Sequence, residues 1–357
     1  MAADQPSQGG VMTAASPPPS SPNPQPPASG GTVQQIGEGG TGYQVNQPQA
    51  PVIQGTGNQV TIHYGPVQPP ENLQAGVPFR VRGGGSGVFV GRGKELVNLQ
   101  KLLQQPGVVA IAAAAGLGGV GKTTLAREYV QRYREAYPAG IWWLEPGDRS
   151  GSLILEAELL GWGAPPDTLQ TSEQQVQWVY EQWLVRFPEG DRLLVWDDGE
   201  KFSEIRPLLP RDPRFKVLLT SRNKWGAPVR RLDLDSLPRS DAFRLLRTLL
   251  ADDDRLGREV PQAKALCQWL GYLPLAVELV ARYLAVRPGV TLAKTLKRLE
   301  TQRLAARSLS NVPEEMTYRE PVAAAFELSW QTLELPEKEL LATLALFGQA
   351  PIPLALG

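Results

Sequence analysis

Residues Gly116 to Thr124 have the types and the spacing of a loop that binds phosphate. They read Gly-Leu-Gly-Gly-Val-Gly-Lys-Thr-Thr, follow the apolar run Val108 to Ala115, and precede a helix-forming segment that begins at Leu125. A polyphosphate carries several negative charges, so a loop that wraps it needs inward-pointing backbone N–H groups and little side-chain bulk. We therefore expect a strand, a phosphate-binding loop and a helix in succession.

Each residue type in this loop has an expected role. Lys122 is predicted to place its ammonium group beside the β and γ phosphates, and the Thr123 hydroxyl to occupy one coordination position of Mg²⁺. Thr124 is expected to support the start of the helix. The rest of the predicted nucleotide-binding loop consists of Val120 and of glycines that keep side chains away from the phosphates, Gly116, Gly118, Gly119 and Gly121. The alternative is a glycine-rich turn without a ligand.

Two acidic residues follow the apolar run Leu193 to Trp196. A run this continuous suggests a central parallel strand that is covered on both faces, and such sheets bind ligands at the carboxyl ends of their strands. We expect Asp197 to hold Mg²⁺, directly or through water, and Asp198 to position or activate the attacking water. With Lys122 they are the candidate catalytic residues. The alternative is that both acids only form the turn that ends the strand.

A second apolar run, Phe215 to Leu219, ends in Thr220-Ser221-Arg222. An arginine at this position can reach a γ phosphate as a bidentate donor. Arg222 is therefore predicted to report which nucleotide is bound. The alternative is a surface arginine in a loop.

The apolar patterns up to about residue 236 predict the elements that position these groups. Strands are expected at residues 108–115, 140–144, 192–196, 215–219 and 231–234. Strands that alternate with helices imply an α/β fold with an open, mostly parallel sheet. The clearest helix covers residues 172–187, where Ser172 and Gln175 are predicted to form a capping box.

After about residue 236 the strand pattern stops and apolar residues recur at helical spacing. Helices are expected near residues 242–249, 263–269, 275–284 and 292–304, and two more between residues 318 and 346. Pro274 fits the first turn of the third of these because it has no N–H group to satisfy. This part of the chain is predicted to be an all-α domain.

The composition of the chain limits the function classes. The 357 residues contain 36 Lys and Arg and 36 Asp and Glu, so no overall basic field indicates nucleic-acid binding. Cys267 and His63 are each the single residue of their type, which excludes an internal disulfide framework and makes a histidine-based metal or catalytic site improbable. No apolar run reaches the roughly 18 residues of a membrane span. A cytoplasmic protein without a membrane partner is expected.

The first 84 residues are rich in Pro, Gly, Gln and Ser, which predicts a disordered tail. Within it, residues 48–65 contain Val60 and Ile62 in alternation with polar residues after a Gly-Asn turn signal, which indicates a small hairpin or a segment that stacks into cross-β assemblies. This segment resembles in part the amyloid-type motifs of some immune-signalling proteins, although Ile53-Gln54-Gly55 lacks their second apolar residue. The alternative is a linker with a transient hairpin.

The motifs taken together resemble a known family. Their order and spacing resemble the NB-ARC branch of the signal-transduction ATPases with numerous domains (STAND), which belong to the P-loop NTPases. The resemblance covers about residues 85–345 and rests on the phosphate loop and four further segments, Val90 to Arg92, Leu194 to Asp198, Leu219 to Arg222 and Gly271 to Ala276.

The resemblance implies roles for several residues. Val90 and Arg92 would lie against the adenine and the ribose, and Pro274 would pack on the adenine. The Walker A loop would bind the phosphates, the Walker B acids Asp197 and Asp198 would serve Mg²⁺ and hydrolysis, and Arg222 would sense the γ phosphate.

The resemblance also implies a domain order. After the tail, residues 85–236 would form a P-loop NTPase domain with a parallel five-stranded sheet, residues 237–310 an all-α helical domain, and residues 311–357 the start of a truncated winged-helix domain. The family's later histidine motif, which holds ADP in the closed state, and the repeats that usually follow are missing from this sequence.

A regulatory switch is the function that these expectations favour. ADP would hold a closed monomer, ATP would favour an open form that self-associates and clusters the tail for a downstream effector, and slow ATP hydrolysis would reset it. One alternative is a P-loop enzyme, a kinase or transport ATPase with its own substrate. Another is an NB-ARC-type transcriptional regulator that acts through the winged helix, which the neutral charge does not favour.

Overall fold

The computed structural model describes residues 32–35, 41–44, 60–62, 69, 73, 76–81, 87–113, 118–144, 149–250, 253–309 and 319–345. Within these ranges no helix is both long enough and apolar enough to cross a membrane.

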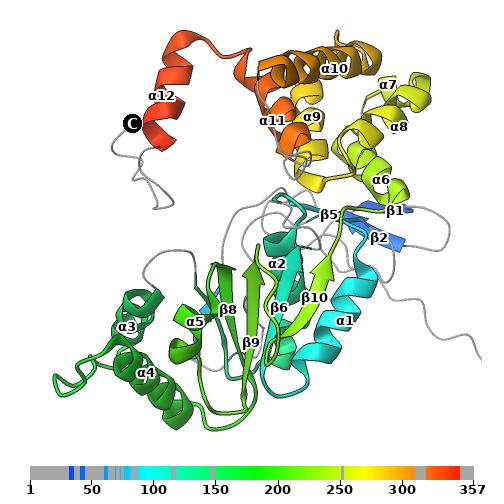
Figure 1. Ribbon diagram of the computed structural model, residues 1–357. Helices are drawn as coiled ribbons and strands as arrows, with labels where there is room; N and C mark the ends of the chain where they lie inside the picture. The colour runs from blue at the N-terminus through cyan, green and yellow to red at the C-terminus, as the bar shows by residue number, and fades with distance from the viewer. Residues whose placement is uncertain are drawn as a thin grey trace, which may run out of the picture.

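A parallel sheet forms the centre of the part before residue 236, which confirms the predicted α/β class (Figure 1). Its strands lie in the order β10-β6-β9-β8-β7-β4, and every neighbouring pair is parallel. The strands are β4 (Phe79–Arg80), β6 (Val108–Ala113), β7 (Ile141–Leu144), β8 (Arg192–Gly199), β9 (Phe215–Ser221) and β10 (Arg230–Leu234).

The predicted count of five strands is wrong by one, because β4 adds a sixth strand beside β7 at the edge of the sheet. Two residues are too short for an alternating pattern, so this strand left no recognisable signal in the sequence. β4 lies within residues 1–84, for which the composition predicts a disordered tail.

Both faces of the sheet are covered, which explains the continuous apolar runs. In β8, Leu193 and Val195 contact one hydrophobic core while Leu194 and Trp196 contact the other. Helices α1 (Gly93–Leu103) and α2 (Lys122–Tyr133) pack on the first face, and α3 (Arg149–Leu159) and α4 (Ser172–Arg186) on the second. A strand buried on both sides needs apolar residues at every position.

The start of α4 differs from its prediction by one residue. Thr171, with an extended backbone, is the N-cap, and it forms the capping box with Gln174 rather than Ser172 with Gln175. Both pairs have the required spacing in the sequence. The box therefore depends on which residue keeps the extended conformation that an N-cap needs.

The second half of the chain is helical, as predicted. Its helices are α6 (Arg239–Leu249), α7 (Arg255–Arg258), α8 (Val260–Trp269), α9 (Pro274–Ala285), α10 (Leu292–Leu309), α11 (Arg319–Trp330) and α12 (Leu335–Ala345). One short helix, α5 (Phe202–Ile205), lies between β8 and β9. In Figure 1, α6 to α11 form one group above the sheet, and α12 projects away from them.

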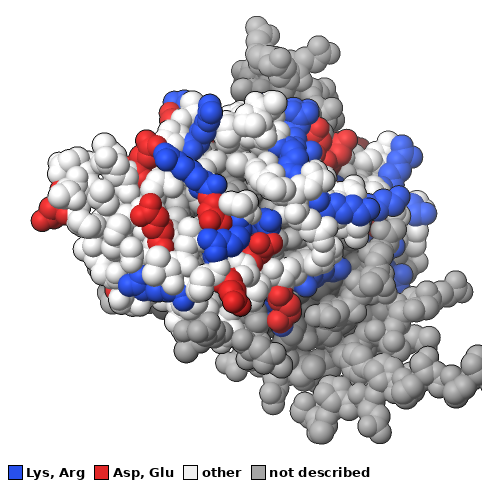
Figure 2. All heavy atoms as spheres, turned by 90° about the horizontal axis from the view of Figure 1, so that it is seen from below, with Lys and Arg blue, Asp and Glu red and all other residues white. Residues whose placement is uncertain are grey.

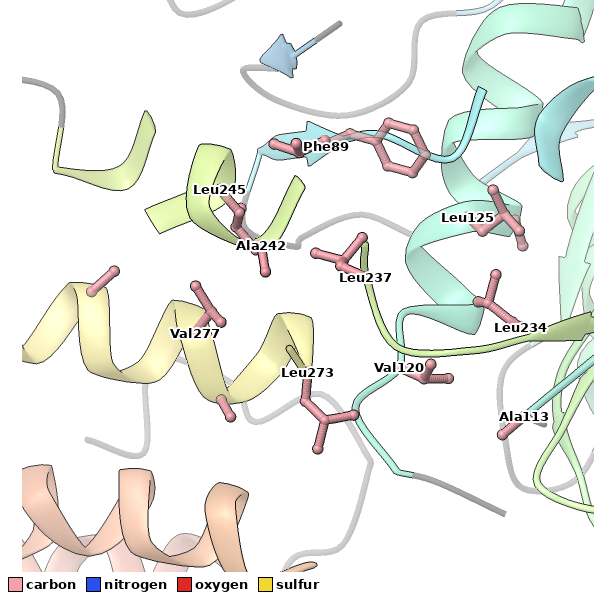
Figure 3. Close-up of a cluster of buried hydrophobic side chains, with 14 of the residues drawn as sticks. Phe89, Ala113, Val120, Leu125, Leu234, Leu237, Ala242, Leu245, Leu273 and Val277 are labelled. Atoms are coloured by element: carbon pink, nitrogen blue, oxygen red, sulfur yellow. The ribbon is translucent and has the colours of Figure 1, made fainter. Parts of the chain in front are cut away.

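The helical group and the sheet domain share one hydrophobic core. Figure 3 shows Leu237 and Leu273 between α6 and α9 on one side and Val120, Leu125 and β10 on the other. All of these side chains are buried. The two parts therefore pack as one body in this structure, and their separation would expose apolar surface to water.

Two short strand pairs involve the first part of the chain, and the second of them connects it to the sheet domain. β1 (Thr32–Gln35) pairs antiparallel with β2 (Thr41–Gln44), and β3 (Val60–Ile62) pairs antiparallel with β5 (Val88–Val90). Val60–Ile62 is thus a strand, as its alternation suggested, and its partner lies outside residues 48–65. The remainder of that segment, and with it the amyloid-type motif, lies outside the described residues.

The surface carries charges of both signs. Figure 2 shows Lys and Arg interspersed with Asp and Glu on the face seen from below. This agrees with the equal numbers of basic and acidic residues in the sequence.

Candidate functional site

The predicted phosphate and magnesium groups converge because of the strand order. β9 lies between β6 and β8, so the loop after β6, the acids at the end of β8 and the arginine after β9 meet at the carboxyl edge of the sheet. A pocket of about 290 Å³ opens there. It is lined by Gly118, Gly119, Gly121, Lys122, Thr123, Thr124, Asp197, Asp198, Arg222, Pro274, Leu275 and Glu278.

Some predicted residues lie elsewhere. Val90, Arg92 and Val120 are buried and do not line this pocket, and Gly116 lies outside the described residues. Two lining residues, Leu275 and Glu278, were not predicted. For Glu278 the sequence offers one signal, its helical spacing from Pro274, because it follows Pro274 by one turn of α9. Leu275 is adjacent to Pro274 in the chain.

Asp197 is fixed by two hydroxyl groups. Its Oδ1 atom accepts hydrogen bonds from Thr123 Oγ1 at 2.8 Å and from Thr220 Oγ1 at 2.5 Å, and the residue is fully buried. A buried carboxylate requires such donors. The loop after β6 is thereby connected to the ends of β8 and β9.

Asp198 has an unusual backbone conformation, with φ of 50°. Its N–H group donates to Thr220 Oγ1 at 2.9 Å, and its carboxylate lies 3.5 Å from Arg222 Nε. The strand register shifts here, between Trp196 and Gly199. A non-glycine residue in the left-handed region is uncommon and is often found at functional sites. Thr220 thus positions both acids, a role that the sequence did not indicate.

The charges around Lys122 suit an anionic ligand. Burial lowers the pKa of its ammonium group, and Arg222 lowers it further, while Asp198 and Asp197 oppose that change. Because a neighbouring phosphate would favour the charged form, binding of a polyphosphate is coupled to the protonation of Lys122.

The same edge offers oxygen atoms of the kind that Mg²⁺ prefers. The Thr123 hydroxyl and the Asp197 carboxylate are held 2.8 Å apart. Over the described residues no cluster of three or more His, Cys, Asp or Glu side chains could hold a metal. This donor set fits Mg²⁺ when it is shared with nucleotide phosphates, because Mg²⁺ is commonly bound through one or two carboxylates together with phosphates and water.

Arg92 connects three segments of the chain. It is the N-cap residue of α1, with φ of 62°, and its guanidinium group donates to the carbonyl oxygens of Val120 and Asp235 and pairs with Glu95. Burial lowers the pKa of this guanidinium. Asp235 follows β10 and precedes the helical group. The hydrogen bonds of Arg92 therefore link the phosphate loop to the segment that connects the two domains.

The first turn of α9 rests on the phosphate loop. Pro274 is the first residue of the helix, as predicted, and the Leu275 N–H group donates to the Gly119 carbonyl at 3.3 Å. Gly119 has φ of +76°, and a Cβ atom there would lie 2.8 Å from Leu275 Cβ. Glycine at this position therefore permits both the loop conformation and the close approach of α9.

Comparisons with known proteins find similarity over the part of the chain that carries this site. Residues 94–251 match the family model of the NB-ARC domain, which covers α1 to α6 and therefore the loop, both acids and Arg222. The regulatory protein AfsR of Streptomyces griseus is 30% identical over 278 residues, which are 75% of this chain and 27% of that protein. AfsR of Streptomyces coelicolor is 29% identical over 256 residues, 70% of this chain and 25% of that protein.

A plant protein is also similar. The probable disease resistance protein RF45 of Arabidopsis thaliana is 25% identical over 213 residues, which are 55% of this chain and 21% of that protein. The chain thus spans about a quarter of the length of these relatives.

Proposed function

We propose that this chain, which carries an NB-ARC domain at residues 94–251, is a signalling switch operated by ATP and ADP. The observation that carries the proposal is that one pocket is lined both by the phosphate-binding loop and by α9 of the helical group. A nucleotide in this pocket contacts two domains, so its phosphates can change the relative stability of their arrangements. The relatives named as regulatory and disease resistance proteins favour signalling over metabolism.

The chemistry proposed for the site is slow hydrolysis of ATP to ADP and phosphate. Bound Mg²⁺, held by Thr123 and Asp197, would neutralise charge on the β and γ phosphates. Asp198 orients a water molecule and accepts its proton as the water oxygen bonds to the γ phosphorus and the bond to the bridging oxygen breaks. Arg222, which pairs with Asp198 in this structure, turns to the γ phosphate and stabilises its charge.

Hydrolysis serves the switch. The arrangement described above, with α9 against the phosphate loop, is here called the closed arrangement, and ADP favours it. ATP favours an open arrangement that self-associates, which brings the tails of several chains together. Clustering of weak tail contacts multiplies their effect on an effector without any new contact surface.

The bound nucleotide should therefore determine whether the protein is a monomer or a larger assembly in solution. We expect the purified protein to carry ADP, to be a monomer with ADP, and to self-associate with a slowly hydrolysed ATP analogue. Chromatography of the released nucleotide and light scattering after size exclusion measure both quantities. An identical mass with both nucleotides would instead favour a P-loop enzyme with its own substrate.

Replacement of Thr220 by valine should slow ATP hydrolysis about tenfold while ADP affinity changes by less than about threefold. Valine has the shape of threonine but lacks the hydroxyl that holds Asp197 and the Asp198 N–H group. Phosphate release and ADP titration measure the two quantities. Thr248→Val is the control, since the Thr248 hydroxyl bonds only the Arg244 carbonyl of α6 among the contacts described. An unchanged rate in Thr220→Val would contradict the positioning role.

The second candidate is a regulator, since two of the similar proteins are named regulatory proteins, and the start of a winged-helix domain expected at residues 311–357 would give it a nucleic-acid output. Nucleotide-dependent retention of double-stranded DNA in a gel-shift titration would support this candidate over assembly alone.

A further inference from the structure

An acidic side chain from the helical group lines the pocket together with residues of the phosphate loop. Glu278 lies one helical turn beyond Pro274 on α9, so both are on the same face of that helix, and both line the pocket. The hydrogen bond from Leu275 to Gly119 holds this turn of α9 against the phosphate loop. Glu278 therefore belongs to the helical group, and it shares the pocket with the residues of the sheet domain that would bind the phosphates.

The carboxylate of Glu278 has a different kind of partner from the carboxylates of Asp197 and Asp198, the other two acids of the pocket. The Asp197 carboxylate accepts from two hydroxyls, and the Asp198 carboxylate pairs with Arg222 within the sheet domain. Glu278 pairs with Arg282, its neighbour one turn further along α9, through Nε at 3.0 Å and Nη2 at 2.8 Å.

The side chain of Arg282 is 59% exposed, whereas that of Glu278 is 23% exposed. A pair of this kind is screened by water, so it leaves part of the negative charge of Glu278 directed at the pocket.

We propose that Glu278 is a residue that sets the preference of the closed arrangement for ADP over ATP. The inference rests on the proposed function, and it deepens it by naming a group through which the helical domain detects the γ phosphate. A γ phosphate adds negative charge beside Lys122 and Arg222, in the pocket that α9 also lines. Repulsion by the Glu278 carboxylate then destabilises the closed arrangement with ATP more than with ADP.

This mechanism supplies the difference in affinity that a switch requires. A ligand shifts an equilibrium between two arrangements only by as much as its affinities for them differ. Lys122 and Arg222 both belong to the sheet domain, so their attraction for the phosphates does not by itself depend on where α9 lies. The Glu278 carboxylate lies on the helical group, which would move, and it repels the γ phosphate. ATP therefore opposes the closed arrangement, whereas ADP does not.

The test compares affinities for ADP and for a slowly hydrolysed ATP analogue, both with Mg²⁺, by displacement of a fluorescent nucleotide from the full chain. Glu278→Gln keeps the shape of the side chain and removes its charge. We expect it to raise the affinity for the ATP analogue about tenfold, equivalent to about 1.4 kcal/mol, and to change that for ADP by less than about twofold.

A second variant should act in the opposite direction. Arg282→Gln removes the partial neutralisation of Glu278 and should lower the affinity for the ATP analogue about threefold, with ADP again little changed. Both shifts should shrink as the salt concentration rises. The matched control is Asp254→Asn, which breaks another i,i+4 acid–arginine pair, with Arg258, that does not line the pocket.

The outcomes are distinct. Opposite changes of the ATP-to-ADP affinity ratio in the two variants support the inference. If the unsubstituted protein binds both nucleotides and Glu278→Gln shifts them equally or not at all, the inference is overturned while the proposed function stands. If the unsubstituted protein binds neither nucleotide, the proposed function fails, and the inference fails with it.

Discussion

Replacement of Lys122 by alanine should weaken the binding of both ADP and ATP by at least about 100-fold. Lys122 lines the pocket between the two acids and Arg222, and burial lowers the pKa of its ammonium group. A partly desolvated cation gains more from a phosphate than an exposed one does, because water screens the interaction less. Isothermal titration with ADP measures the loss.

Lys101→Ala is the matched control, since Lys101 is an exposed lysine at the end of α1. Thermal unfolding of both variants shows whether each retains its fold. Nanomolar affinity for ADP in folded Lys122→Ala would remove the loop from the proposed site.

Replacement of Asp198 by asparagine should slow ATP hydrolysis by at least about 100-fold and leave ATP bound. Asparagine tolerates the left-handed backbone conformation of Asp198, whereas alanine would add strain to the loss of the carboxylate. The carboxylate is the group that accepts the proton of the attacking water in the proposed mechanism. Single-turnover phosphate release measures the rate.

The control for this variant is Asp233→Asn in β10, where the acid pairs with Arg231 at the surface. It removes one carboxylate from the same sheet without touching the pocket. Turnover in Asp198→Asn equal to that of the unsubstituted protein would exclude Asp198 from the hydrolytic step.

Much of the sheet and of the phosphate site could be predicted from the sequence. The strands that position the loop, the acids and Arg222 are buried on both faces, so each contains a largely apolar run; the glycine-rich loop follows the run of β6, and polar residues follow those of β8 and β9. The parallel order then brings those ends together at one edge. Local composition therefore sufficed for β6, β8 and β9.

Other features depend on contacts between distant segments, which local patterns do not contain. β4 is too short for a pattern, and the partner of β3 is β5, which lies outside residues 48–65. Glu278 looked like an ordinary polar residue of an amphipathic helix. Its position at the pocket follows from how α9 packs on the loop, through Leu275 and Gly119, and this packing is a property of the tertiary structure.

The pairing of β3 with β5 has a consequence for the order in which the molecule opens. A two-stranded pair of three residues each is held by few backbone hydrogen bonds and has far less cooperative support than the six-stranded sheet. The amides of this strand pair should therefore lose protection from solvent exchange before those of the six-stranded sheet. Since β5 leads directly into Gly91 and Arg92, this strand pair lies next to the hydrogen bonds by which Arg92 joins the phosphate loop to the helical group, and its opening would release the chain before β5 from that region.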